Sequence, residues 1–217
     1  MTKEGYLPAL RFEWLTGLYD PVIRWTMREG RFKTQLVAQA RIERGHRVLD
    51  LGCGTGTLTI LIKRMHPDAD VVGLDGDPKI LELARSKATL AGLDIVLDCG
   101  MADALPYPDK TFDRVVSSLV VHHLTRNTKL RALCEVMRVL KPGGELHVAD
   151  FGTPHNAAMY GVSLVIRHFE EVADNVKGLL PAMLRETGFD RIEETVRYST
   201  VFGTLALLKA SKPDVSA

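Results

Sequence analysis

The sequence is poor in cysteine and carries little excess charge. Its 217 residues include three cysteines, an odd number, which lie far apart at Cys53, Cys99 and Cys134. This spacing suits neither a disulfide framework nor a zinc site, so we expect reduced thiols, a reducing compartment and no bound metal. The formal net charge is +1, and no block of lysine and arginine is present. Neither a nucleic acid nor an anionic membrane is therefore expected as an obligate partner.

Long apolar runs are also missing from the chain. No run approaches the length of a transmembrane span, and the first six residues, MTKEGY, lack the apolar centre of a signal peptide. We therefore expect a cytoplasmic protein without an integral membrane segment. No internal repeat, low-complexity block or linker divides the sequence, which suits a single domain. The sequence leaves the oligomeric state open.

The most informative stretch is a glycine-rich loop between an apolar run and an amphipathic segment. The run from Arg47 to Leu51 is followed by glycine at every second position from Gly52 to Gly56. Behind the loop, apolar residues recur at the spacing of one helix face, at Leu58, Leu61, Ile62 and Met65. A strand, a glycine loop and a helix in this order bring a polar ligand against bare backbone at a helix N-terminus. The stretch therefore predicts a nucleotide-type cofactor site.

Strand-like and helix-like segments alternate along most of the chain. Strands are expected at residues 47–51, 71–75, 95–99, 114–118 and 145–151, and helices at 31–43, 58–65, 78–92 and 127–140. This alternation predicts a parallel sheet with helices on both faces. Residues 141–144, with one proline and two glycines, predict a type II turn. A helix at 176–187, which Pro181 either interrupts or starts, precedes strand-like runs at 191–200 and 202–210. The short connection between these runs predicts a hairpin and an antiparallel last strand.

Residues 1–44 differ from the rest because they gather apolar and aromatic side chains, including both tryptophans, Trp14 and Trp25. We interpret them as an N-terminal helical cover packed on the core, and we expect this cover to act as a lid over a binding site. Residues 45–212 would form the cofactor-binding part of the same domain.

A dinucleotide-binding fold is the first alternative for the glycine loop. Gly52, Gly54 and the acidic Asp75 imitate its fingerprint. The third glycine of that fingerprint would fall on position 57, which is Thr57. Asp50, ahead of the loop, would repel a pyrophosphate but would suit a cationic amino group. An NAD-dependent oxidoreductase is therefore kept only as an outside alternative.

Four segments together carry a resemblance to a known family: VLDLGCGTG (48–56), GLDGDP (73–78), LPYPDKTFD (105–113) and LKPGG (140–144). In this order and spacing the chain resembles the class I methyltransferases that depend on S-adenosylmethionine (SAM). Within that superfamily it is most similar to the menaquinone/ubiquinone-biosynthesis C-methyltransferases and related small-molecule methyltransferases. The resemblance implies an α/β, Rossmann-like, doubly wound fold whose seven-stranded sheet is mostly parallel with an antiparallel last strand.

The resemblance also implies which residues hold SAM. The methionine part would lie against the backbone of Gly52, Gly54 and Thr55, with its ammonium group near Asp50 and its far end near Ser118. The ribose would bind Asp75, and the adenine would lie beside Gly76, Asp77, Met101 and Ala102.

Position 101 departs from the family pattern, in which an acidic or amide side chain usually reaches the adenine amino group. This chain has Met101 there, followed by Ala102 and Asp103. Either Asp103 supplies the contact instead, or the backbone does and Met101 only packs on the ring. We favour the second alternative.

Methyl transfer from SAM is an in-line displacement that leaves S-adenosylhomocysteine (SAH), and the protein mainly aligns the acceptor and excludes water. A general base is needed only if the acceptor must lose a proton. His122 and His123 follow the fourth strand, so one of them could act as this base. Equally, both could only shape the loop. Tyr19, His155 and Tyr160 are weaker candidates on the acceptor side.

The acceptor is our least constrained hypothesis. The aromatic N-terminal cover and the apolar residues 157–169 could enclose a hydrophobic pocket, which favours a quinone-like or phenolic small molecule. The menaquinone-type enzymes lack the His122-His123 pair, so their substrate is not carried over to this chain. The alternatives are an N-methyltransferase acting on an amine or a lipid headgroup, and a non-catalytic SAM-binding protein.

Overall fold

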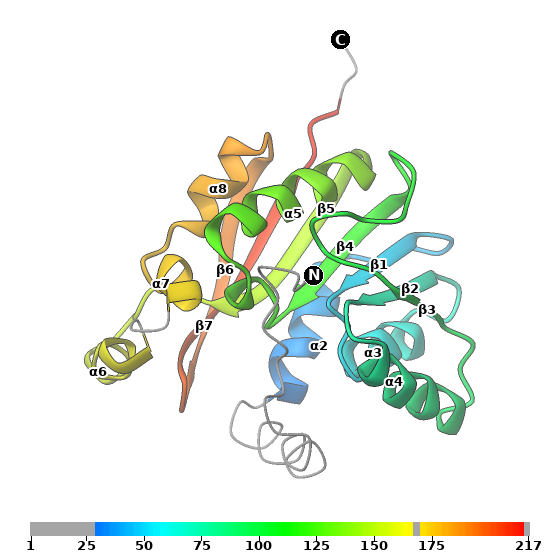
Figure 1. Cartoon of the computed structure of the whole chain (residues 1–217), viewed down its shortest axis with the longest axis horizontal. Helices are drawn as coiled ribbons and strands as arrows, with labels where there is room; N and C mark the ends of the chain where they lie inside the picture. Colours follow the sequence, from blue (N-terminus) through cyan, green and yellow to red (C-terminus); the bar gives the residue numbers. More distant parts are fainter. Residues whose placement is uncertain (1–28, 167–169, 215–217) are drawn as a thin grey trace, which may run out of the picture.

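The computed structural model describes residues 29–166 and 170–214. Within these ranges, seven strands form one sheet in the order β3-β2-β1-β4-β5-β7-β6 (Figure 1). The strands are β1 (Arg47–Leu51), β2 (Asp70–Asp75), β3 (Val96–Cys99), β4 (Phe112–Ser118), β5 (Leu140–Phe151), β6 (Asp190–Thr200) and β7 (Gly203–Ser211). The helices are α2 (Glu29–Gln39), α3 (Thr57–Met65), α4 (Pro78–Leu90), α5 (Arg126–Val139), α6 (Ala157–Ile166), α7 (Glu170–Val176) and α8 (Leu180–Glu186), with a 3₁₀ turn η2 (Val121–His123). Residues 1–28 of the expected N-terminal cover, with Tyr19, lie outside the described part of the chain.

The sheet changes strand direction only at β7, which confirms the predicted antiparallel last strand. β1 pairs in parallel with β2 on one side and with β4 on the other. β7 runs antiparallel to both β5 and β6. The order in which strands are added therefore reverses between β1 and β4. In open α/β sheets, ligands bind at the carboxyl ends of the strands at such a switch point.

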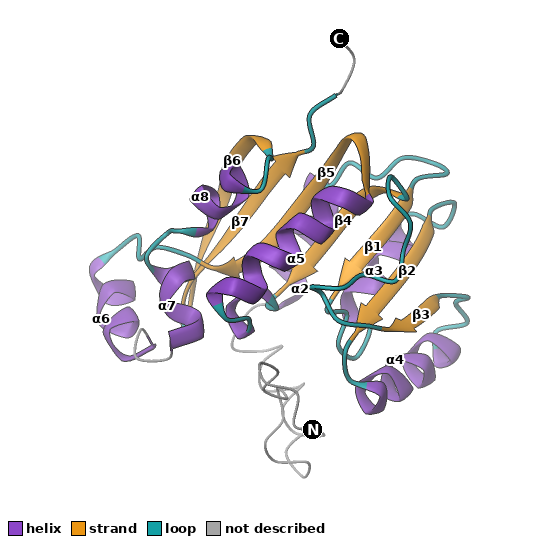
Figure 2. Ribbon diagram, turned by 45° about the horizontal axis from the view of Figure 1, so that its top comes forward, coloured by secondary structure: helices purple, strands orange, loops and turns teal. Residues whose placement is uncertain are grey.

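Alternating side chains of the strands build an apolar layer on each face of the sheet. Leu49 and Leu51 of β1 pack in one core cluster with residues of α5 and α8. Val48 packs in a second cluster with residues of α2 and α3. This split follows from the two-residue period of a strand. Figure 2 shows α5 on the near face of the sheet and α2 and α3 on the far face, which is the predicted doubly wound arrangement.

Several of the expected segments have different bounds in the structure, and two of these differences have a clear physical reason. The helix expected at 176–187 is helical only over Leu180–Glu186, as α8, because the chain breaks after α7 at Gly178 (φ +73°) and Pro181 lies in the first turn of α8. Proline is tolerated there since its missing N–H has no partner in a first helical turn. β5 begins at Leu140, not at Glu145, and its pairing with β4 shifts register near Phe112. The expected turn at 141–144 therefore lies within the bounds of β5, where Gly143 has a φ of +72°.

Residues 29–166 and 170–214 contain neither a membrane-spanning helix nor a cluster of metal-ligating side chains. No helix in these ranges is long and apolar enough to cross a membrane. The same ranges contain no group of three or more His, Cys, Asp and Glu side chains that could hold a metal ion.

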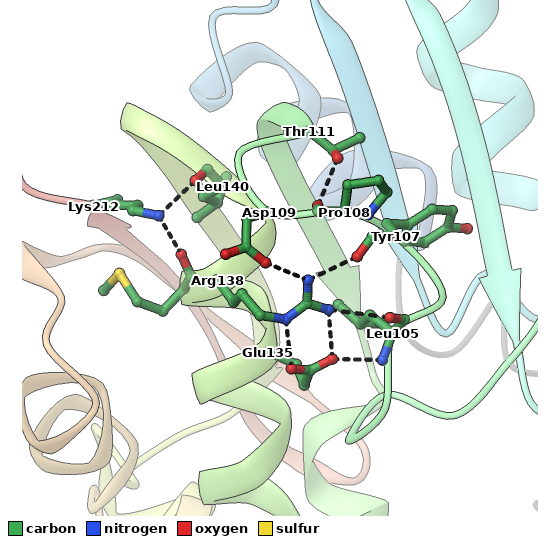
Figure 3. A network of polar contacts seen from close by, with 10 residues as sticks. Leu105, Tyr107, Pro108, Asp109, Thr111, Glu135, Arg138, Leu140 and Lys212 are labelled. Carbon is green, nitrogen blue, oxygen red and sulfur yellow. Dashed lines mark hydrogen bonds and ion pairs between the residues drawn. The ribbon is translucent and has the colours of Figure 1, made fainter.

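Arg138 of α5 fastens the long loop between β3 and β4 to the helix layer (Figure 3). Its guanidinium donates to the Glu135 carboxylate at 2.8 Å, to Asp109 at 2.9 Å and to the Tyr107 carbonyl at 2.7 Å. The Leu105 N–H donates to the same Glu135 carboxylate at 2.7 Å. Hydrogen bonds from Arg138 hold the pKa of Glu135 below its ordinary value. This network fixes the loop that leads from the predicted adenine side back into the sheet.

We expect Arg138→Gln to lower the free energy of unfolding by about 2–3 kcal/mol, because several charge-assisted hydrogen bonds to partly buried groups are lost. Arg131→Gln is the matched control on the same helix: Arg131 pairs with Asp103 at 2.8 Å, but its side chain is 58% exposed. An exposed pair of this kind contributes less than about 1 kcal/mol. Urea unfolding of both variants measures the difference, and equal losses would contradict the anchoring role of Arg138.

Candidate active site

The glycine loop is tied to β2 and closes tightly over the end of β4. The N–H groups of Gly52 and Cys53 both donate to the Leu74 carbonyl, at 2.8 and 2.9 Å. Gly52 has a φ of +70°, and a Cβ there would lie 2.4 Å from Cγ2 of Val120, so only glycine fits. Gly54 also has a positive φ of +53°, but a Cβ there would meet no atom of the described residues within 4 Å. The backbone of Gly54 therefore borders open space, as a cofactor cradle requires.

Asp75 ends β2 with its carboxylate held beside this loop. Its Oδ2 accepts from the N–H of Gly54 at 2.9 Å, and its Oδ1 accepts from the N–H of Asp77 at 3.0 Å. Asp77 in turn caps α4 by accepting from the N–H of Lys79 at 2.9 Å, as its position before Pro78 indicated. Each oxygen of Asp75 keeps a second lone pair. The Asp75 carboxylate is therefore oriented to accept hydrogen bonds from a ligand with two neighbouring hydroxyls.

Asp50 lies beneath the loop and not on its surface. It is 1% exposed, and its Oδ2 accepts from the Thr59 hydroxyl at 2.6 Å. Burial raises the pKa of Asp50 from an ordinary 3.8 to about 6, while the Thr59 hydrogen bond and the nearby cation of Lys33 act in the opposite direction. A buried carboxylate of this kind is poised to be ionised by a cationic group that binds next to it.

The raised pKa gives a prediction for stability without ligand. Because the folded pKa of about 6 lies above the ordinary 3.8, ionisation of Asp50 lowers the free energy of unfolding as the pH rises through this window. Asp50→Asn should remove that loss, so the difference between variant and wild type should grow from pH 4 to pH 6 and reach about 1–3 kcal/mol at higher pH. Urea unfolding at pH 4 and pH 8 measures it, with the exposed Asp68→Asn as control. A difference that is equal at both values would contradict the prediction.

The predicted adenine side is formed by the segment after β3. A Cβ at Gly76 would lie 2.9 Å from the sulfur of Met101, so Met101 packs directly over the backbone that follows Asp75. Asp103 is engaged elsewhere, because its Oδ2 accepts from Arg131 at 2.8 and 3.2 Å. Ala102 packs against the core of the sheet. This arrangement is consistent with a backbone contact and a packing role for Met101, the alternative that we favoured.

The end of β4 carries two unusual features side by side. The hydroxyl oxygen of Ser118 is buried and has no hydrogen-bond partner among the described residues. Leu119, the next residue, has a φ of +59°, a left-handed conformation that is strained for leucine. Buried polar groups without partners are rare in proteins, and strained backbone concentrates at functional sites. Both features support the prediction that Ser118 faces a ligand.

His122 and Asp150 form a buried pair that the sequence analysis missed. Nδ1 of His122 lies 2.8 Å from Oδ1 of Asp150, and the two residues are 8% and 1% exposed. The same carboxylate accepts from the N–H of His122 at 3.2 Å and from that of Phe151 at 2.7 Å. Burial acts to raise the pKa of Asp150, but the neighbouring imidazole and these hydrogen bonds hold it below its ordinary value. Asp150 therefore stays ionised and fixes the imidazole.

The signal for Asp150 was present in the sequence. Asp150 comes near the end of a predicted strand, as Asp75 does, and the turn with His122 leaves the neighbouring strand. Ser118 of β4 pairs with Ala149 of β5, so the two chain segments that follow the pair lie at one edge of the sheet. The sequence alone does not reveal that β4 and β5 are neighbours in the sheet, so it could not reveal this pair.

The other acceptor-side candidates lie apart from this pair or on the surface. His123 is exposed, with its ring 4.0 Å from that of His122. His155 has one ring nitrogen 2.9 Å from the Thr204 hydroxyl and the other 3.1 Å from that of Ser199, so it holds its loop to the β6–β7 hairpin. Tyr160 on α6 is 60% exposed.

Comparison with known proteins identifies the relatives of this chain. A family described as methyltransferase domain matches residues 48–144. A demethylmenaquinone methyltransferase of Thermus thermophilus is 38% identical over 151 residues, which are 69% of this chain and 66% of that protein. The chain spans 58–66% of the length of three such demethylmenaquinone methyltransferases.

A solved structure shares the fold, and a second relative is covered over more of its length. The YcgJ protein of Bacillus subtilis has a TM-score of 0.67 at 18% identity, covering 83% of this chain and 97% of that one. The ubiquinone/menaquinone biosynthesis C-methyltransferase UbiE of Pseudomonas paraeruginosa is 31% identical over 196 residues, 79% of this chain and 75% of that protein. The chain therefore belongs to the class I SAM-dependent methyltransferases, the family of the menaquinone and ubiquinone biosynthesis C-methyltransferases.

Proposed function

We propose that this protein transfers a methyl group from SAM to a small aromatic acceptor, quinol-like or phenolic, that loses a proton in the reaction. The observation that carries the proposal is the buried pair of His122 and Asp150 beside the cofactor loop, because a histidine oriented by a carboxylate is the usual form of a general base. The names of the relatives, which are demethylmenaquinone and ubiquinone/menaquinone methyltransferases, agree with an acceptor of the quinol class.

The residues of the cofactor loop fit SAM in three respects. The open backbone at Gly54 leaves room for its methionine part, the lone pairs of Asp75 suit its ribose hydroxyls, and the hydroxyl of Ser118 lacks a partner within the described residues. In the proposed complex Asp50 faces the ammonium group, and Gly52 and Thr55 line the methionine part. Adenine is held by Gly76, Asp77, Met101 and Ala102. When bound, SAM supplies an electrophilic methyl group on a positively charged sulfur.

The chain itself contributes a base and its orientation. Asp150 accepts a hydrogen bond from Nδ1–H of His122, and this tautomer leaves the lone pair of Nε2 available. Nε2 then takes the proton that the acceptor loses as it is methylated, and the Asp150 carboxylate stabilises the imidazolium that results. His122 is 8% exposed, which keeps bulk water away from the base. His123 has no part in this step, since it lies on the surface.

Two measurements test the proposed function. Calorimetric titration should show binding of SAM and SAH and none of NAD. Transfer of labelled methyl from SAM should then mark phenols or reduced quinones in a panel that also holds amines. Binding of NAD without binding of SAM would overturn the assignment as a methyltransferase. Transfer of label to amines alone would overturn the proposed acceptor class. Binding of SAM without transfer to any compound would indicate a SAM-binding protein without catalysis.

A further inference from the structure

Helix α7 is anchored beside the two elements that carry the proposed base and its carboxylate. It packs on η2, which contains His122, on β5, which contains Asp150, and on α6. Asp174 of α7 forms ion pairs with two cations of α5, at 3.5 Å from Arg126 and 3.9 Å from the fully buried Lys129. Figure 2 shows α7 beside the N-terminal end of α5. These ion pairs hold α7 over the carboxyl edge of the sheet.

The chain after α7 is fixed as well. A Cβ at Gly178 would lie 2.7 Å from the methyl group of Thr153, which follows β5, so the chain runs in close contact with the end of that strand. The Leu179 N–H donates to the Asp174 carbonyl at 3.0 Å. The C-terminal half of α7 is therefore held in place by Asp174 on the helix and by the chain that follows it.

Asn175, next to Asp174, has a side chain whose polar groups the described residues leave unsatisfied. It is 2% exposed, and neither its Nδ2 nor its Oδ1 has a hydrogen-bond partner in the described part of the chain. A buried amide without partners is unfavourable, and folded proteins normally avoid it. The helix that carries this buried amide packs on η2 and β5, the elements that carry His122 and Asp150.

We propose that Asn175 is a specificity-determining residue of the acceptor site. This proposal rests on the methyltransferase function proposed above. The amide side chain offers a carbonyl oxygen and an N–H group next to each other. Both are satisfied by an aromatic ring with two adjacent oxygen substituents, one a hydroxyl that donates to Oδ1 and the other an oxygen that accepts from Nδ2. The acceptor class is therefore a vicinally oxygenated phenol, with His122 positioned for the proton that it releases.

The test uses the full chain saturated with SAH and two probes that differ in one oxygen. Wild type should bind 2,3-dihydroxynaphthalene at least about tenfold more tightly than 2-naphthol, since a site built for two polar groups discriminates against an analogue that lacks one. Asn175→Leu should lose at least about tenfold in affinity for the diol and keep its affinity for 2-naphthol within about threefold. Asn127→Leu, on the exposed surface of α5, is the control and should change neither.

Thermal unfolding without ligand separates this role from a structural one. Asn175→Leu should raise the midpoint of unfolding, because it removes a buried amide without partners. A lower midpoint together with equal loss of both probes would show that the amide is bonded within the fold and would overturn the proposal.

The proposal would also fail if wild type bound both probes equally or bound neither. In each of these cases the proposed methyltransferase function stands as long as wild type binds SAM. Absence of SAM binding by wild type would instead overturn that function.

Discussion

Replacing His122 by alanine is expected to lower kcat by about 100- to 10,000-fold, the range that a general base contributes. The Kd of SAM should stay within about twofold, because His122 contacts the acceptor and not the cofactor in the proposed site. Asp150→Asn should lower kcat by about 100-fold, since an amide cannot hold the imidazole in the tautomer that leaves Nε2 as the acceptor. Single-turnover transfer of labelled methyl measures both variants.

The exposed neighbour provides the control for this experiment. His123→Ala should keep kcat within about threefold, because the His123 ring lies near that of His122 but on the surface of the protein. Unchanged kcat in His122→Ala would reject the base and, with it, the argument for an acceptor that loses a proton. A loss of kcat of equal size in His123→Ala would show that the role of the base cannot be assigned to His122 alone.

The second large effect concerns the cofactor. Asp75→Ala should weaken SAM binding by at least about 100-fold, because two hydrogen bonds from ribose to an ionised carboxylate are lost at about 1.5–3 kcal/mol each. The same change removes the acceptor of the Gly54 and Asp77 N–H groups, so the loop also loses its support. Calorimetric titration with SAM and SAH measures the effect.

Asp70→Ala at the opposite end of β2 is the matched control. Asp70 forms an exposed ion pair with Arg47 at 3.0 Å, far from the carboxyl edge of the strand, and its loss should leave the Kd of SAM within about twofold. If Asp75→Ala binds SAM as wild type does, Asp75 is only a support for the loop, and the predicted ribose contact is wrong.

Much of the fold was predictable because its signals are local. Alternation of buried strands and amphipathic helices indicated a parallel sheet, and the short link before Gly203 indicated an antiparallel hairpin, which the pairing of β6 and β7 confirms. The two differences in bounds have causes of different kinds. Pro181 suits either a helix start or a break, and only the left-handed Gly178 decides between them. The early start of β5 at Leu140 depends on pairing with Phe112, which no pattern within either segment reveals.

The candidate site was predictable where the chain folds on itself within a short distance. Asp75 and the glycine loop belong to consecutive elements, and their contact at Gly54 follows from that order. The pairing of His122 with Asp150 spans 28 residues and needs β4 and β5 to be neighbours. The unsatisfied groups of Ser118 and Asn175 are properties of burial alone, so a sequence cannot display them.

The strand order has an evolutionary consequence. Apart from Ser118, the residues proposed to bind the cofactor precede β4 in the chain, whereas the proposed base and its carboxylate follow it. Among the described strands, these two halves meet only along the pairing of β1 with β4. Selection can therefore exchange the acceptor chemistry of the second half while the first half keeps its ligand. The alignment of Leu51 with Ser117 has to be kept, because a shift of one residue in this pairing would change the position of the methyl donor relative to the proposed base.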